Sequence, residues 1–143
     1  MLPELSLEGK TAVVTGGGRG IGRDIALAFA EAGADIVVAA RTSSEIEATV
    51  ADIRSMGREA VALPTDVSKS EDVDNLAERA LEHFGKVDIL VNNAGKLMRL
   101  AVVPFADSTV NPPTVTRDST SRTTDEEWQS VLNPNLNGVF YCC

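Results

Sequence analysis

The sequence predicts an α/β fold built on a doubly wound parallel sheet, and three observations predict it. From Thr11 onward, short apolar runs alternate with longer amphipathic stretches, the pattern of parallel strands joined by crossover helices. The apolar runs are nearly continuous, as in DILV at 88–91, which is typical of strands buried on both faces. A glycine-rich turn, TGGGRGIG at 15–22, joins the first run to the first amphipathic stretch. The 143 residues, 43% of them hydrophobic, suffice for one domain with one core.

The composition limits the expected partners. The formal net charge is −8, whereas nucleic-acid-binding proteins cluster Lys and Arg, so we expect no nucleic-acid partner. No stretch approaches the ~20 apolar residues of a membrane span, and the start MLPELSLEGK has no signal-peptide pattern. We therefore expect a cytoplasmic protein without membrane contact. Cys142 and Cys143 are the only cysteines and His83 is the only histidine, so neither a disulfide framework nor a metal site is predicted.

Four strands are predicted, each a short apolar run bounded by turn-forming residues. They are 11–16, 34–40, 59–66 and 87–95. Three βα units in succession are typical of the doubly wound arrangement, whose strand order is 3-2-1-4-5-6. The chain supplies only the first four of these strands, so the sheet is expected to be incomplete on its C-terminal side.

Helix boundaries are predicted from capping residues. The second, third and fourth helices each start with a Ser or Thr followed three residues later by Glu, a possible capping box. These pairs are Ser44 with Glu47, Ser68 with Glu71, and Thr124 with Glu127. Glycine is expected to end the first three helices, because it readily adopts the left-handed conformation that follows a helix. The glycines in question are Gly33, Gly57 and Gly85.

Apolar residues at helical spacing predict the buried stripe of each helix. The expected stripes are Ile21, Ile25, Ala28, Phe29 and Ala32; Ile46, Val50 and Ile53; Val73, Leu76, Ala77, Ala80, Leu81 and Phe84; and Trp128, Val131, Leu132, Leu136, Val139 and Phe140. Pro134 is expected to kink or break the last helix, because proline lacks an amide donor and costs about 3 kcal/mol inside a helix. That expectation leaves the position of the neighbouring Asn135 open.

An irregular segment interrupts the regular pattern at about 96–123. It is rich in Ser, Thr, Pro and Asn and longer than an ordinary connection between a strand and a helix. Two interpretations stay open, a flexible insertion and a functional lid.

The glycine-rich turn admits three interpretations. A P-loop would need lysine and a hydroxyl after its last glycine, but Arg23 and Asp24 stand there. The dinucleotide fingerprint GxGxxG is absent in its strict form. Gly16, Gly20 and Gly22 nevertheless open a helix directly after a strand, where free amides and the helix dipole can receive a pyrophosphate. A purely structural glycine turn is the third possibility.

Four motifs in order carry a resemblance to a known family. They are TGGGRGIG after the first strand, DV at 66–67, NNAG at 92–95 and Asn135, the first asparagine of NLNGVF. Together they resemble the N-terminal part of the short-chain dehydrogenase/reductase family, over essentially the whole chain apart from 96–123. The resemblance implies a single NAD(P)-binding Rossmann domain over 1–143. It also implies reversible hydride transfer between a small-molecule alcohol and a ketone or aldehyde.

The resemblance assigns roles to individual residues. It implies that Asp66 and Val67 lie beside the adenine, and that Asn135 is catalytic, organising a water and a proton relay to the family's lysine. The segment Asn93, Ala94 and Gly95 would stabilise the central sheet and border the cofactor ribose. The cofactor loop would comprise Gly16, Gly18, Arg19, Gly20, Ile21 and Gly22.

The residues at the end of the second strand favour NADP over NAD. NAD enzymes usually hold the ribose 2′-hydroxyl with an acidic residue about 20 positions beyond the glycine loop, whereas NADP enzymes use a cation. That strand ends VVAAR, without a carboxylate, and Arg41 is joined by Arg19 in the loop.

The family's catalytic serine and Tyr-x-x-x-Lys motif are not found in these 143 residues. The isolated chain is therefore expected to be inactive, and either self-associating or marginally folded. A longer parent is expected to be a homo-oligomer. The alternative interpretation is a catalytically silent nucleotide-binding half-domain.

Overall fold

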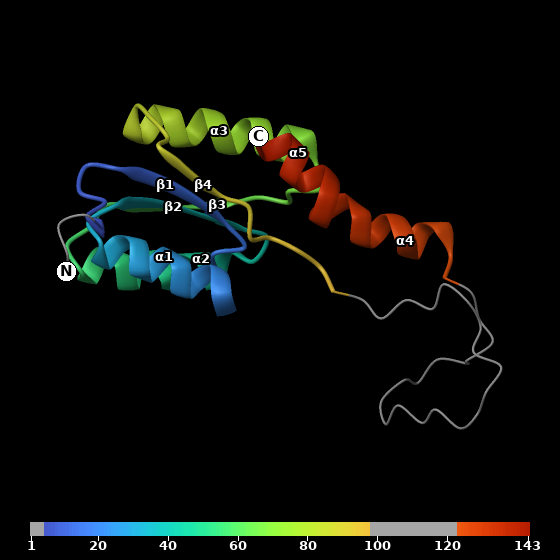
Figure 1. Ribbon diagram of the computed structural model, residues 1–143, viewed down its shortest axis with the longest axis horizontal. Coiled ribbons are helices and arrows are strands. Elements are labelled where there is room, and N and C mark those ends of the chain that lie inside the picture. The colour runs from blue at the N-terminus through green and yellow to red at the C-terminus, as the bar shows by residue number, and fades with distance from the viewer. Residues whose placement is uncertain (1–4, 98–122) are drawn as a thin grey trace, which may run out of the picture.

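The protein has a four-stranded parallel sheet with helices on both faces (Figure 1). The computed structural model describes residues 5–97 and 123–143, so the predicted irregular segment lies mostly outside the described residues. The sheet order is β3-β2-β1-β4. The strands are β1 Thr11–Thr15, β2 Asp35–Ala40, β3 Ala60–Pro64 and β4 Ile89–Val91. This order is the first half of the doubly wound arrangement and confirms the predicted fold class.

The helices lie on the two faces in the way that this topology requires. Figure 1 shows α1 and α2 together against one face of the sheet, and α3 with α5 on the other. Their bounds are α1 Gly20–Glu31, α2 Ser43–Ser55, α3 Ser70–Phe84, α4 Asp125–Leu132, a π-helical turn η2 Asn133–Asn137, and α5 Gly138–Cys142. No helix in the described part of the chain has the length and apolarity needed to cross a bilayer.

Two hydrophobic clusters hold the helices to the sheet. Successive strand residues point to opposite faces. Val14 and Val38 accordingly pack with Ile46 of α2, whereas Val13 and Val37 pack with Leu76 of α3. The central strands β1 and β2 are buried on both faces as predicted. The prediction is wrong for DILV, because β4 is an edge of the described sheet and Leu90 is 37% exposed.

The predicted stripe of α1 is wrong in part. Gly22, Ala26 and Ala30 are the buried residues, whereas Ile21 is 74% exposed and Ala28 is exposed. Small residues face the sheet because they let the helix axis approach it closely. The larger side chains stand to either side of that contact.

In the other helices the stripes are confirmed where a sheet face covers them. Ile46, Val50 and Ile53 are buried in α2, and Val73, Leu76 and Ala80 in α3. Some predicted core residues are instead exposed, because no described element covers them: Ala77, Leu81, Trp128, Leu136, Val139 and Phe140.

Only one of the three predicted capping boxes exists. Thr124 and Glu127 cap α4 reciprocally. Helix α2 instead begins after Thr42 and α3 after Lys69, and neither residue caps with its side chain. Ser68 does not cap α3 because its hydroxyl and its amide both donate to the Asp66 carboxylate. The glycines predicted to end α1, α2 and α3 all have positive φ angles, as expected.

The last helix does not break at Pro134. It widens instead into the π-turn η2, in which the Gly138 amide donates to Asn133 O, five residues back. A proline ring clashes with the carbonyl four residues earlier in an α-helix, and a π-turn relieves that clash. Beyond the turn, Gly138 packs so closely on Val67 that a β-carbon would lie 2.9 Å from its side chain.

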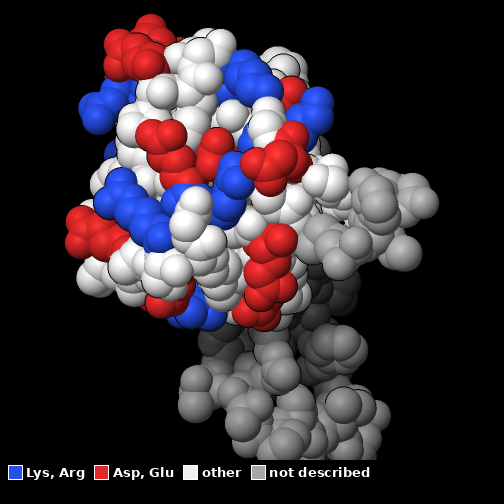
Figure 2. Space-filling model, turned by 90° about the vertical axis from the view of Figure 1, so that its left-hand side faces the viewer, with Lys and Arg blue, Asp and Glu red and all other residues white. Residues whose placement is uncertain are grey.

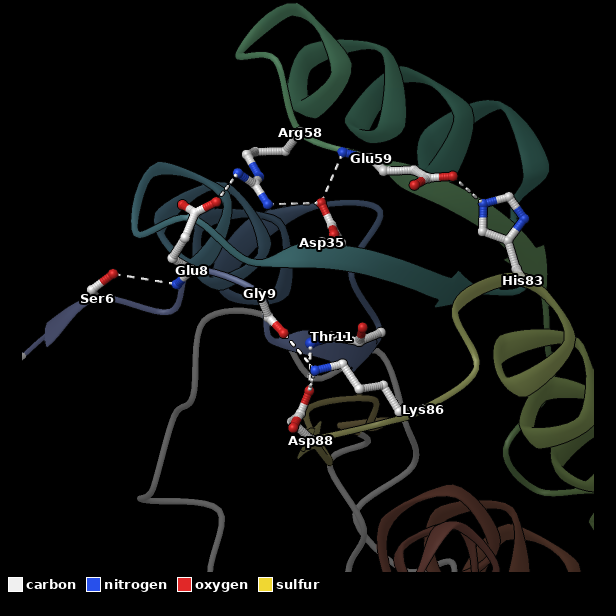
Figure 3. Close-up of polar contacts among 10 residues, drawn as sticks. All are labelled: Ser6, Glu8, Gly9, Thr11, Asp35, Arg58, Glu59, His83, Lys86 and Asp88. Carbon is white, nitrogen blue, oxygen red and sulfur yellow. Dashed lines mark hydrogen bonds and ion pairs between the residues drawn. The ribbon is translucent and has the colours of Figure 1, made fainter.

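Ion pairs and hydrogen bonds join the amino ends of the strands. Arg58 bridges Glu8 and Asp35 at 3.0 and 3.1 Å, and Asp88 accepts from the Thr11 amide at 2.9 Å (Figure 3). Charges of both signs alternate over this side of the molecule (Figure 2). The opposite edge, where the strands end, carries the candidate site.

Candidate cofactor-binding site

A cleft of about 570 Å³ lies at the carboxyl ends of the strands. Ligands of open parallel sheets bind at this edge, where successive connections leave the sheet in opposite directions. Here that point is between β1 and β4. The lining residues are Gly16, Gly18, Arg19, Gly20, Ala39, Ala40, Arg41, Thr42, Glu45, Thr65, Asp66, Val67, Ser68, Asn93, Ala94, Gly95, Lys96, Ser130, Asn133 and Pro134.

Thr15 and Asn93 tie the ends of β1 and β4 together behind this cleft. The buried Thr15 hydroxyl donates to Val91 O and accepts from the amides of Asn93 and Ala94, all at 3.1 Å. The Asn93 side chain donates in turn to Thr15 O at 3.0 Å and to Gly16 O at 3.3 Å. Five hydrogen bonds thus fix the glycine turn relative to the end of β4.

The protein's own packing explains most glycines of the turn. A β-carbon on Gly22 would overlap Gly16 O and the Asn93 amide, and one on Gly16 would lie 2.8 Å from that same amide. A β-carbon on Gly17 would lie 2.8 Å from the Val38 side chain, and one on Gly18 would lie 2.9 Å from the Glu45 side chain. These four positions would therefore need glycine even without a ligand.

Gly20 is different. It has a φ of +54° and lines the cleft, and apart from its chain neighbours and the backbone of its own helix no described atom lies within 4 Å of the position its β-carbon would take. It also opens α1, whose amino end has no side-chain cap. Free amides at a helix amino terminus attract anions. The cleft therefore fits a group with a phosphate at this point.

Most of the predicted cofactor residues lie together in the cleft. The exceptions are Ile21, which is exposed outside it, and Gly22, which is buried against Asn93. Asn135 does not line the cleft either. Its side chain accepts from the Lys96 amide at 2.9 Å and donates to Lys96 O at 2.7 Å. It therefore clamps the loop that follows β4.

The cleft is positive in an acidic protein. It carries the cations Arg19, Arg41 and Lys96 and the carboxylates Glu45 and Asp66, whereas the whole chain has a net charge of −8.

Sequence reasoning missed Glu45, which lies in the first turn of α2 with its carboxylate 3.9 Å from Arg19 Nε. It also missed Lys96, Ser130 and Asn133, which no motif marks. Among the described residues, no group of three or more potential ligands could hold a metal ion.

Asp66 is held in its ionised form. Its partial burial would raise the pKa of the carboxyl group, but hydrogen bonds from the Ser68 hydroxyl and amide outweigh that effect. The charges of Arg41 and Lys69 act in the same direction, so the pKa lies below its usual value. The carboxylate is thus an acceptor at neutral pH.

Comparison with known proteins identifies the family. The family model described as short chain dehydrogenase matches residues 10–143. The chain belongs to this family. The 3-oxoacyl-[acyl-carrier-protein] reductase of Synechocystis is 38% identical over 139 residues, which are 96% of this chain and 49% of that protein.

Solved structures of the short-chain dehydrogenase family superpose closely. A putative short-chain alcohol dehydrogenase from Sinorhizobium meliloti has a TM-score of 0.78 at 39% identity, covering 98% of this chain and 48% of that one. A 3-ketoacyl-(acyl-carrier-protein) reductase from Brucella melitensis complexed with NADH has a TM-score of 0.71 at 37% identity, covering 96% and 48%. The chain thus spans about half the length of these relatives.

Proposed function

We propose that the protein is an NAD(P)-dependent oxidoreductase that transfers hydride between a small-molecule alcohol and a ketone or aldehyde. The observation that carries this proposal is Gly20, whose bare backbone faces an open cleft at the uncapped end of α1. Membership of the short-chain dehydrogenase family and the oxidoreductase names of similar proteins support it.

The residues of the cleft fit a dinucleotide. The first amides of α1, with Gly20, would hold the pyrophosphate. Asp66 and Val67 would border the adenine, and Asn93, Ala94 and Gly95 the ribose. The nicotinamide ring of the bound cofactor would supply or accept the hydride. What this chain contributes is binding and orientation, because the Thr15–Asn93 hydrogen bonds hold the two sides of the cleft in one geometry.

We favour NADP(H) as the cofactor. Arg41 is exposed in the cleft and makes no ion pair with any described residue, so its charge is available to a 2′-phosphate. Arg19 is 84% exposed and only loosely paired with Glu45. Two observations favour NAD as the second candidate: the Glu45 carboxylate in the cleft, and the NADH in the complex of the Brucella protein.

Four further proposals concern the protein as a whole. We propose a cytoplasmic location and, for a longer parent, a homo-oligomeric state. We also propose that the 143-residue chain alone does not turn over substrate, because no Tyr-x-x-x-Lys occurs within it. Asn135 would act through the loop it clamps: by holding the Lys96 backbone, it would keep the preceding Gly95 beside the cofactor.

Calorimetric titration of the chain with NADPH and NADH tests the function. Gly20→Ala should weaken dinucleotide binding at least tenfold, because the new methyl group would enter the cleft. Gly57→Ala is the matched control. Gly57 also has a positive φ, +82°, and among the described residues only its chain neighbours come within 4 Å of the β-carbon position, but it ends α2 outside the cleft. Both variants should lose roughly 1–2 kcal/mol of stability from the left-handed backbone. Equal dinucleotide affinity in the two variants would contradict the proposal.

A further inference from the structure

Lys96, Ser130 and Asn133 form one end of the cleft, which we call the α4 rim. Lys96 follows β4, Ser130 lies on α4, and Asn133 begins the π-turn. Lys96 Nζ donates to Ser130 Oγ at 3.1 Å, and Ser130 donates in turn to Glu127 O at 2.8 Å. The ammonium group is therefore held at the cleft by a neutral partner.

The rim side chains offer unused donors. An ammonium has three N–H donors, and within the described part of the chain Lys96 uses one and pairs with no carboxylate. The Asn133 side-chain oxygen accepts from Asn137 Nδ2 at 2.9 Å, while Asn133 Nδ2 has no acceptor among the described residues. A positive charge beside a free amide donor matches an anionic oxygen group, since charge-assisted hydrogen bonds are roughly twice as strong as neutral ones.

The α4 rim is separate from the cations proposed for the cofactor. Arg41 follows β2 and Lys96 follows β4, and β1 lies between these strands. Neighbouring strands are about 4.8 Å apart, so the two strands that lead to these residues are separated by roughly 10 Å. The backbone of Lys96 is also held in place, because the Asn135 side chain forms hydrogen bonds with both the Lys96 amide and the Lys96 carbonyl.

We propose that the α4 rim binds an anionic oxygen group of the substrate. The substrate class is then a carbonyl or hydroxy compound that carries a carboxylate or a phosphate monoester. This inference rests on the proposed function for the hydride transfer, but anion binding at the rim can be measured without it. Lys96 would orient the substrate through its charge and would not take part in the chemistry.

The test uses matched pairs of probes that differ in charge. Levulinate is compared with methyl levulinate, and dihydroxyacetone phosphate with dihydroxyacetone. Binding to the ¹⁵N-labelled chain is followed by NMR shifts of the Lys96 amide and the Asn133 side chain, with and without NADPH. Lys96→Met removes the charge and keeps an unbranched stem, Lys96→Arg restores the charge, and Lys69→Met removes an exposed lysine that does not line the cleft.

At least one anion should bind ten or more times as tightly as its neutral partner. That preference should disappear in Lys96→Met and persist in Lys96→Arg and Lys69→Met, with NADPH affinity in Lys96→Met within twofold of wild type. The pair that shows the preference tells carboxylate from phosphate. Absence of any charge preference would overturn the inference, as would a tenfold loss of NADPH affinity in Lys96→Met, which would assign Lys96 to the cofactor. Failure of wild type to bind NADPH would instead refute the proposed function. Titration with the probes alone would still show whether the α4 rim binds anions.

Discussion

The side-chain amide of Asn93 fills the space that a β-carbon on Gly22 would need. The two residues are far apart in sequence, yet each restricts the other, because Asn93 also donates to Gly16 O in the turn that precedes Gly22. The glycine turn is therefore shaped by the end of β4 as well as by any ligand.

Gly22→Ala should destabilise the protein. An alanine inside a helix normally raises stability by roughly 1 kcal/mol relative to glycine. Here the methyl group would overlap Gly16 O and the Asn93 amide, so we expect a loss of at least about 2 kcal/mol in urea unfolding. Unchanged or increased stability would contradict the close packing of these residues.

Arg41→Asp should shift cofactor preference toward NAD. Loss of a charged hydrogen bond costs about 1.5–3 kcal/mol, so NADPH affinity should fall more than tenfold, with little change for NADH. Arg79→Asp makes the same charge change on α3, outside the cleft. Calorimetric affinities for the two cofactors check this prediction. It fails if the NADPH to NADH ratio is the same in both variants.

The stabilising contribution of Asp88 should depend on pH. Hydrogen bonds from the Thr11 amide and the Lys86 ammonium lower its pKa from 3.8 to about 2 (Figure 3). Because the folded-state pKa is depressed, the contribution is present above about pH 4 and is lost as the pH falls through about 2. Asp88→Asn should lower the urea midpoint at pH 7, and the difference from wild type should vanish near pH 2.

Asp74→Asn is the control for that series. Asp74 is exposed on α3, so Asp74→Asn should lower the urea midpoint at neutral pH much less than Asp88→Asn does. A difference between wild type and Asp88→Asn that stays constant down to pH 2 would show that Asp88 acts through packing and not through its charge.

Asn135→Ala should loosen the loop after β4. The variant loses both hydrogen bonds to Lys96, so the exchange rate of the Lys96 amide should rise tenfold or more in hydrogen-exchange NMR. Asn137→Ala removes a comparable amide from the same π-turn without touching Lys96. Equal exchange rates at Lys96 in the two variants would argue against the clamp.

Strand positions were predictable because buried parallel strands leave long apolar runs. The strand ends were less so: 87–95 was predicted, but β4 is Ile89–Val91. The backbone amides of Asn93 and Ala94 donate to the Thr15 side chain and not to the backbone of β1, and apolar patterning does not predict this change of partner. The failed capping box at Ser68 has a similar cause, because Asp66 competes for its hydroxyl.

The candidate site was predictable only where a motif marks it. The glycine turn, Asp66 and the segment after β4 were found through ordered motifs, and the structure gathers them around one cleft. The α4 rim could not be found in this way, because Lys96 and Ser130 meet only through the placement of α4. The burial of α1 was misjudged because large apolar residues dominate a sequence stripe, whereas close helix packing selects Gly22, Ala26 and Ala30.

The π-turn at Asn133–Asn137 makes the last helix tolerant of a one-residue deletion. A π-turn holds one more residue than the α-helical turn it replaces, so it absorbs that residue without changing the direction in which later residues face. Deleting Pro134 should therefore restore a regular α-helix and leave Gly138 against Val67. Deleting one residue from the middle of a regular helix such as α3 would instead rotate everything after it by about 100°. A single-codon deletion in the π-turn should thus be far less damaging than one in α3.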